Sequence, residues 1–441
     1  MIKGLFKKGI VFLLEKEARI VLRKYQPKVV AITGSVGKTS TKDSIYTALS
    51  KFYFVRKSYK NFNTEVGVPI TILDVPTGGS SPVEWLKNLL EGLKLAFLPS
   101  LYPDWLVLEV GADHKGDIRE IGNWLKPDVV VITRLSEVPV HVENFESPEE
   151  LYEEKGELVK ALKPDGTLIL NAEDEMVLSY RNLTSAKVIL YGDSKESNLK
   201  AKDYEVVYTE DGRPKGITFT VESGDPTSPK ATTGKENIPV FLGGTLGKHH
   251  VQHILASFAV CKSAGEHLSV VGNSFKNHEP TAGRMRILEG KSNTTIIDDT
   301  YNSSPIAVFE ALNSLRGLKN NKRNIVVLGD MLELGKYSID EHKKAGEQVQ
   351  KVADVLCTVG VRSKFMVEGA LGAGMKEKNI HEFGNSVEAG EFLKDFIKTG
   401  DVVLVKGSQG MRMEKVVEAL MAHPEDKEKL LVRQDAEWRN R

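Results

Sequence analysis

The sequence has only two cysteines, Cys261 and Cys357, in 441 residues. Two thiols are too few for a zinc ribbon or a disulfide framework, so the small disulfide-rich secreted folds are excluded and a reducing, cytoplasmic compartment is indicated. Long apolar runs are also missing. The longest near the start, residues 9–14 (GIVFLL), is far shorter than the roughly 20 residues that span a bilayer. We therefore expect neither a secreted nor a membrane-spanning protein.

The sequence also lacks an excess of charge of either sign. Lys plus Arg and Asp plus Glu each number 60, so the net charge is zero. This balance argues against a protein that holds nucleic acid through bulk positive charge. The apolar fraction of 41% is ordinary for a globular protein, and the length predicts two to four domains.

Residues 1–28 have the pattern of a basic amphipathic helix. Apolar residues recur at helical spacing, and six Lys and two Arg stand against two Glu. Two interpretations stay open. The helix makes a peripheral contact with an anionic membrane surface, or it docks on its own domain.

Short apolar runs alternate with helical patterns through the centre of the chain. Such runs are typical of parallel strands buried on both faces, and the alternation predicts a doubly wound α/β domain of P-loop type over residues 29–286. Residues 204–221 alternate apolar and polar side chains about an Asp-Gly pair, which predicts a β-hairpin insertion. The predicted parallel strands are residues 29–33, 105–109, 129–133 and 167–171.

A second alternation of this kind begins at residues 294–299 and continues through 324–328 and 402–405. It predicts a Rossmann-like C-terminal α/β domain over residues 287–441, joined to the first by a linker around Gly283.

A glycine-rich turn, residues 34–41 (GSVGKTST), lies between the first predicted strand and a predicted helix. Backbone N–H groups of such a turn and the helix N-terminus favour an anion. Lys38 can reach the β- and γ-phosphates of ATP, and the Thr39 hydroxyl can bind Mg²⁺. The predicted ATP-binding residues of this turn are Gly34, Ser35, Val36, Gly37, Lys38, Thr39 and Ser40.

The spacing of this turn, GxxGK[ST], is shorter than the usual GxxxxGK[ST] and resembles that of the Mur ligase family. Members of this family are ATP-dependent, amide-forming enzymes of cell-wall synthesis. Further segments, in the same order along the chain, resemble the branch that adds D-alanyl-D-alanine. No single segment is specific, but their combination and order are. They are residues 61–69 (NFNTEVGVP), 298–302 (DDTYN), 328–335 (LGDMLELG) and 406–414 (KGSQGMRME).

This resemblance implies a metal and carbamate site. Glu109, at the end of a predicted strand, resembles a ligand of the Mg²⁺ that bridges the phosphates, and His141 resembles a ligand of a second ion. Lys155 aligns with the lysine that carries a carbamate in many members, although by sequence alone it would be a solvated helix lysine. The implied catalytic residues are Lys38, His141 and Lys155, and the implied metal ligands are Thr39, Glu109 and His141.

The resemblance also implies contacts from both domains with the substrates. His250 and His253 stand where the family's segment that borders the adenine commonly has asparagines, and Arg284 resembles an arginine that reaches the phosphates when the domains close. Asp299 resembles an aspartate near the ribose, with a helix cap as the alternative. The candidates for binding the other substrates are Asn63, Thr64, Asn302, Ser303, Lys406 and Ser408.

The implied reaction forms an amide bond at the expense of ATP. The carboxylate of a muramoyl-peptide precursor attacks the γ-phosphoryl group, and D-alanyl-D-alanine then captures the acyl phosphate. We expect a cytoplasmic monomer. The branch normally has an N-terminal domain that grips UDP, and 28 residues are too few to form one, so we expect this domain to be lacking. The alternatives are a related ligase with another acceptor, such as a folylpolyglutamate or cyanophycin synthetase, and a non-catalytic nucleotide-binding regulator.

Overall fold

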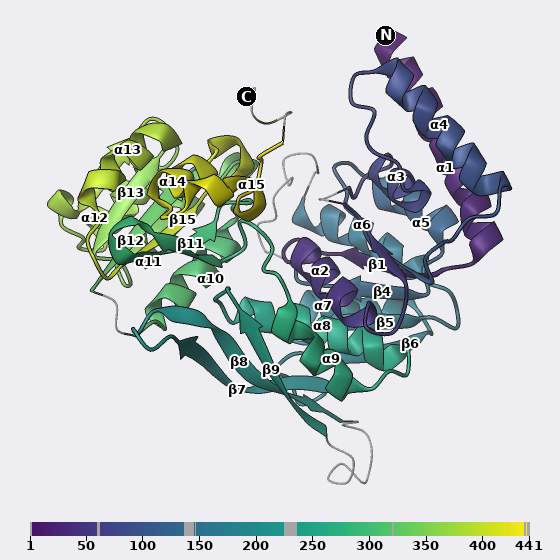
Figure 1. The fold of residues 1–441 in the computed structure, drawn as a ribbon, viewed down its shortest axis with the longest axis horizontal. Coiled ribbons are helices and arrows are strands. Elements are labelled where there is room, and N and C mark those ends of the chain that lie inside the picture. Colours follow the sequence, from purple (N-terminus) through teal and green to yellow (C-terminus); the bar gives the residue numbers. More distant parts are fainter. Residues whose placement is uncertain are drawn as a thin grey trace.

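The protein is described by a computed structural model that covers residues 2–59, 62–135, 145, 147–224, 236–319, 322–435 and 438. The described residues form two sheets flanked by helices, one of nine strands and one of six (Figure 1). This confirms the predicted α/β class with two parallel-dominated sheets.

The nine-stranded sheet has the order β2-β3-β1-β4-β5-β6-β7-β8-β9. Its first six strands are parallel, and β7, β8 and β9 are antiparallel neighbours. The strands are β1 (Lys28–Thr33), β2 (Val55–Lys57), β3 (Trp105–Glu109), β4 (Val129–Ile132), β5 (Thr167–Asn171), β6 (Lys187–Tyr191), β7 (Leu199–Tyr208), β8 (Pro214–Ser223) and β9 (Glu236–Gly243).

The four predicted parallel strands are confirmed as β1, β3, β4 and β5. The predicted hairpin is confirmed as β7 and β8, but it is not a separate insertion. Tyr191 of β6 pairs in parallel with Leu199 of β7, so the hairpin continues the central sheet, and β9 adds a third antiparallel strand.

Helices cover both faces of this sheet, and the side chains of β1 alternate between them. Val30 and Ile32 face α2 and α8, whereas Val29 and Ala31 face the side of α1, α3, α5 and α6. The helices are α1 (Ile2–Tyr25), α2 (Lys38–Leu49), α3 (Gly67–Leu73), α4 (Pro82–Phe97), α5 (Asp117–Leu125), α6 (Pro148–Lys160), α7 (Glu175–Ser179), α8 (His249–Ser263) and α9 (Leu268–Ser274).

The six-stranded sheet has the order β10-β11-β15-β12-β13-β14, with only β10 antiparallel to its neighbour. The predicted boundary between residues 286 and 287 falls within β10 and stays a prediction. The elements are β10 (Arg286–Gly290), β11 (Thr294–Asp299), β12 (Arg323–Gly329), β13 (Val355–Val359), β14 (Ile380–Phe383), β15 (Asp401–Lys406), α10 (Pro305–Arg316), α11 (Ser338–Val349), α12 (Lys364–Gly372), α13 (Ser386–Phe396), α14 (Glu414–Leu420) and α15 (Lys427–Leu430).

Helix α1 docks on its own domain, in agreement with the second of the two interpretations of residues 1–28. Leu14, Ala18 and Val21 are fully buried, and α1 lies alongside α4 (Figure 1). The Lys24 ammonium donates to the carbonyls of Leu95 and Leu98 at 3.0 and 2.6 Å. The apolar face of α1 is therefore largely occupied by the protein itself.

One carboxyl group is buried between α1 and α4. Glu17 is 6% exposed, and a Cβ at Gly92 of α4 would collide with its carboxylate. Its Oε2 has no hydrogen-bond partner among the described residues. Burial raises the pKa of Glu17 to about 7 from 4.5.

We expect Glu17→Gln to stabilise the protein in a pH-dependent way. The raised pKa means that the folded state binds the proton more tightly than the unfolded chain, so the stability from Glu17 is present below pH 4.5 and is lost as the pH rises through about 7. The substitution should raise the free energy of unfolding by about 2 kcal/mol near pH 8 and by little near pH 5. Urea unfolding at the two pH values measures this, and an equal effect at both would contradict it.

Candidate active site

The glycine-rich turn closes tightly between β1 and α2. Gly37 has a φ of 87°, and a Cβ at Gly34 would overlap the Thr133 hydroxyl, so both positions require glycine. The Thr133 hydroxyl donates to the carbonyl of Val36 at 2.7 Å. The Lys38 ammonium donates to the carbonyl of Gly34 at 2.8 Å. Since no side chain caps α2, its N-terminal N–H groups are left to bind an anion.

Buried polar atoms without a hydrogen-bond partner gather near this turn. Leaving such an atom unsatisfied typically costs about 1–3 kcal/mol, so a group of them in one place points to a polar ligand. Within the described part of the chain they include Ser35 Oγ, His249 Nδ1, Gln252 Oε1, His253 Nδ1 and Arg284 Nε.

A cavity of about 1000 Å³ opens beside the turn. Val36 of the turn and the neighbouring Thr133 line it, together with polar and aromatic side chains of other elements. Its volume is at the upper end of the range for cofactor and nucleotide sites. Lining residues from four elements are Asn171 of β5, Tyr204 and Tyr208 of β7, His249, Gln252 and His253 of α8, and Phe309 and Glu310 of α10.

The histidine segment borders this cavity through His249 and His253, and the predicted contact of His250 with the adenine stays a prediction. His250 is turned to the Thr245 hydroxyl, 3.0 Å from its Nε2, and does not line the cavity. His249 and His253 do, because residues four apart share one face of a helix. Burial lowers the pKa of both well below the usual value, so each ring is neutral near pH 7. The i, i+4 spacing was the signal in the sequence that identifies this pair.

Oxygen atoms suited to Mg²⁺ meet at the C-terminal edge of the sheet. The Thr39 hydroxyl donates to Glu109 Oε2 at 3.0 Å, and the Asn63 amide lies 3.4 Å from Glu109 Oε1. Glu109 is 2% exposed, and hard oxygen donors of this kind fit Mg²⁺. Among residues that the structure describes, no group of three or more His, Cys, Asp and Glu side chains is placed to hold a metal. His141 lies outside the described residues.

Lys155 is buried rather than solvated. It lies on α6 and is 4% exposed. Burial, together with the Lys38 ammonium, lowers the pKa of Lys155 to about 7. The neighbouring Glu154 accepts hydrogen bonds from the N–H groups of Gly116 and Ile118 at the start of α5, which fixes α6 against α5. A substantial fraction of this buried amine is therefore unprotonated near pH 7.

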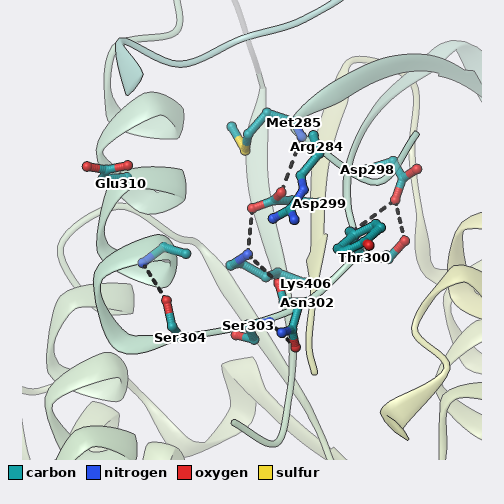
Figure 2. Close-up of polar contacts among 12 residues, drawn as sticks. Arg284, Met285, Asp298, Asp299, Thr300, Asn302, Ser303, Ser304, Glu310 and Lys406 are labelled. Atoms are coloured by element: carbon teal, nitrogen blue, oxygen red, sulfur yellow. Dashed lines mark hydrogen bonds and ion pairs between the residues drawn. The ribbon is translucent and has the colours of Figure 1, made fainter. Parts of the chain in front are cut away.

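Asp299 and Lys406 form a buried ion pair, and their predicted contacts with the ribose and with a substrate stay predictions. Lys406 is 1% exposed, its ammonium lies 2.7 Å from Asp299, and it donates to the carbonyl of Asn302 at 2.9 Å (Figure 2). These contacts of the Lys406 ammonium order the loop after β11. Asp299 is not the alternative helix cap, because the Ser304 hydroxyl caps α10.

Arg284 and the C-terminal tail also contact the loop after β11. The Arg284 guanidinium stacks on the Tyr301 ring, 4.1 Å from its centroid. Arg433 donates to the carbonyls of Thr300 and Tyr301 and pairs with Glu414. Sequence reasoning missed Arg433, since a charged tail gives no sign that one of its arginines is buried.

A second cavity, of about 460 Å³, lies between loops of the nine-stranded sheet and loops of the six-stranded sheet. Four of the six predicted substrate residues line it, two from each predicted domain. Ser303 does not. It is 2% exposed, and its Oγ has no hydrogen-bond partner in the described ranges. The predicted residues that line the cavity are Asn63, Thr64, Asn302 and Ser408. Tyr301 and Asp113, which were not predicted, line it as well.

Comparison with known proteins decides the family. The model of the Mur ligase middle domain matches residues 32–83 and 92–261, just over half of the chain, and that of the Mur ligase glutamate ligase domain matches residues 283–409. The chain belongs to the Mur ligase family. In this family the two sheets described above are therefore the middle and the C-terminal domain.

Two curated relatives of this Mur ligase share one name. The UDP-N-acetylmuramoyl-tripeptide–D-alanyl-D-alanine ligase of Bacillus subtilis is 29% identical over 412 residues, which cover 93% of this chain and 79% of that protein. The enzyme of the same name from Haemophilus influenzae is 28% identical, covering 92% of this chain and 81% of that protein.

Solved structures agree with this Mur ligase fold. MurF ligase from Thermotoga maritima, solved in complex with ADP, has a TM-score of 0.73 and 26% identity, covering 95% of this chain and 84% of that one. Folylpolyglutamate synthase from Mycobacterium tuberculosis has a TM-score of 0.61 at 15% identity, covering 92% and 94%, which shows a common fold alone.

Proposed function

We propose that this Mur ligase joins D-alanyl-D-alanine to the carboxylate of a UDP-muramoyl tripeptide with hydrolysis of ATP to ADP and phosphate. The names of the relatives from Bacillus subtilis and Haemophilus influenzae support these substrates. The ADP complex of the Thermotoga maritima ligase supports the nucleotide. Two buried free thiols fit a cytoplasmic enzyme. No helix among the described residues is long and apolar enough to cross a membrane.

The observation that carries this proposal is the position of Glu109 between the two sites. One carboxylate oxygen accepts from Thr39 of the phosphate turn, and the other lies within reach of Asn63, which lines the smaller cavity. The γ-phosphoryl group and the acceptor carboxylate would thus meet at Glu109. Direct phosphoryl transfer between two substrates needs this adjacency, because the reacting atoms must approach to about 3–3.5 Å.

The side chains then have distinct tasks. The larger cavity receives the adenosine between Tyr204, His249 and Gln252, and the phosphates reach back to the turn. Lys38 and Arg284 offset the negative charge on the transferring phosphoryl group. Thr39 and Glu109 would hold Mg²⁺, which supplies further charge compensation when bound.

The acceptor carboxylate attacks the γ-phosphorus, so a carbon–oxygen–phosphorus link forms and ADP leaves. The dipeptide amine then attacks the acyl carbon, phosphate leaves with one oxygen of the former carboxylate, and the amine loses a proton. Asn63 and Thr64 from one domain and Asn302 and Ser408 from the other position these two substrates. No protein nucleophile is needed, so the protein contributes orientation and charge.

Lys155 is proposed to carry a carbamate. Its neutral amine can attack CO₂ with loss of one proton, and the product is an anion beside the Lys38 ammonium. The lowered pKa supports this proposal, because only the unprotonated amine reacts.

Phosphate release across pairs of substrates tests the proposed function. We expect turnover that requires ATP, a UDP-muramoyl tripeptide and D-alanyl-D-alanine together, with either substrate alone giving background. Turnover with folate and glutamate instead would assign the chain to the folylpolyglutamate type. Nucleotide binding without turnover for any pair would identify a non-catalytic regulator.

A further inference from the structure

Helix α4 exposes an apolar stripe along its outer face. Its large apolar side chains follow one another at intervals of three and four residues, which places them on one side of a helix. The inner face packs on the domain core through other residues, among them Trp85 and Leu89. The stripe consists of Val83, Leu86, Leu90, Leu93 and Phe97, which are 62%, 59%, 51%, 41% and 69% exposed, and Leu98 and Leu101 extend it at 56% and 85%.

This stripe is more apolar than the folding of the chain requires. Exposed side chains of this size are ordinary when scattered, but a contiguous row of them marks a surface that another body covers. The adjoining helix α1 adds Phe12 and Leu13, which are 58% and 47% exposed. Both helices stand at one outer edge of the molecule (Figure 1).

Two of the stripe residues, Leu86 and Leu90, lie outside the segments that the family's middle-domain model matches, whereas the other stripe residues lie within them. The middle-domain model matches residues 32–83 and resumes at residue 92, so it skips most of the first half of α4. None of the stripe residues lines either cavity of the active site. The stripe is thus not explained by the reaction.

The charge of the neighbouring residues indicates what kind of surface covers the stripe. Residues 1–28, which contain α1, hold six Lys and two Arg against two Glu in a chain of zero net charge. Lys16 and Arg23 lie on α1, where Arg19 pairs with Glu15. Lys87 and Lys94 of α4 pair with Glu84 and Glu91, so the positive excess at this edge comes from α1. Apolar side chains flanked by cations are the combination that binds the interface of an anionic bilayer, where the apolar face enters the acyl boundary and the cations meet the headgroups.

We propose that α4, supported by α1, docks the protein on the surface of an anionic lipid bilayer. The helix of 16 residues is about 24 Å long, too short to span the bilayer but suited to lie in its plane. Residues 1–28 alone do not form this contact, because much of the apolar face of α1 is buried. Thr77, in the segment just before α4, lines the smaller cavity, so the docked face is close in the chain to the substrate site.

Sedimentation of the full-length protein with vesicles tests this proposal. We expect binding to vesicles of phosphatidylglycerol and phosphatidylcholine, weaker binding in about 0.5 M salt, and little binding to phosphatidylcholine alone. Leu86→Ser, Leu90→Ser and Phe97→Ser combined should lower binding to the anionic vesicles at least about tenfold while phosphate release in solution stays unchanged. Val361→Ser, at a side chain 79% exposed in the other domain, is the matched control and should bind like the unmodified protein.

Three outcomes would overturn the proposal. The first is no binding to anionic vesicles, and the second is equal binding by the triple variant. The third is a dimer in light scattering that dissociates in the triple variant without any vesicle binding, because the stripe would then face a second copy of the chain. None of these outcomes depends on which amine the enzyme uses, so failure here is distinct from failure of the proposed function.

Discussion

Lys38→Ala is expected to lower the rate of phosphate release by about a hundredfold to a thousandfold, with the fold retained. Lys38 opens α2, and its ammonium reaches back over the turn to the carbonyl of Gly34. Burial lowers its pKa, whereas the Glu109 carboxylate acts in the opposite direction and favours the charged form. A bound triphosphate would strengthen that second effect, so the charge is available where the phosphoryl group transfers.

The control for this substitution is Lys51→Ala. Lys51 is exposed and lies just beyond the end of α2 that is remote from the turn, so its loss should leave turnover unchanged. Circular dichroism and urea unfolding check that both variants fold. A Lys38→Ala protein with normal turnover would contradict the assignment of the phosphate site.

Lys155→Ala is expected to reduce turnover by about a hundredfold and to be partly rescued by added formate or acetate. If the buried amine carries a carbamate, its removal deletes an anion and leaves a space near Lys38. A short carboxylate can occupy that space and restore the charge. Phosphate release measured against carboxylate concentration records the rescue.

Lys160→Ala provides the comparison on the same helix. Lys160 is exposed and, among the described residues, pairs with Glu157 three residues earlier, so its loss should affect neither turnover nor its response to formate. A ¹³C signal from labelled bicarbonate that is lost in Lys155→Ala would report the carbamate directly. Full loss of turnover without any rescue, and without a labelled carbon in the unmodified protein, would remove the carbamate from the account.

The sequence predicted those parts of the fold that follow from local patterns. Buried parallel strands read as short apolar runs, so β1, β3, β4 and β5 were predicted within about one residue. The phosphate turn is local too, since its glycines, Lys38 and Thr39 are consecutive. Asn63 and Ser408 were identified through resemblance rather than pattern, and the fold brings them into one cavity.

Other features depend on contacts between distant segments, which a single sequence does not reveal. Lys155 has the sequence environment of a solvated lysine and is buried because α6 packs against α5 and β1. Lys406 and Asp299 are over 100 residues apart and become partners because β11 and β15 are neighbours. His249 and His250 are neighbours in the sequence, and only their positions around the helix decide that the first lines the cavity and the second does not. The sequence does not reveal the exposed stripe on α4, because the buried face of this helix is apolar as well.

The transfer of an oxygen atom tests the central claim most directly, namely that two domains bring a carboxylate to the γ-phosphoryl group of ATP. The acceptor peptide is prepared with ¹⁸O in its terminal carboxylate, and the phosphate released in the presence of ATP and D-alanyl-D-alanine is examined by mass spectrometry. The account predicts one ¹⁸O atom in each phosphate, because the acyl phosphate breaks at its acyl carbon. Phosphate released with amide formation but without the label would contradict the account.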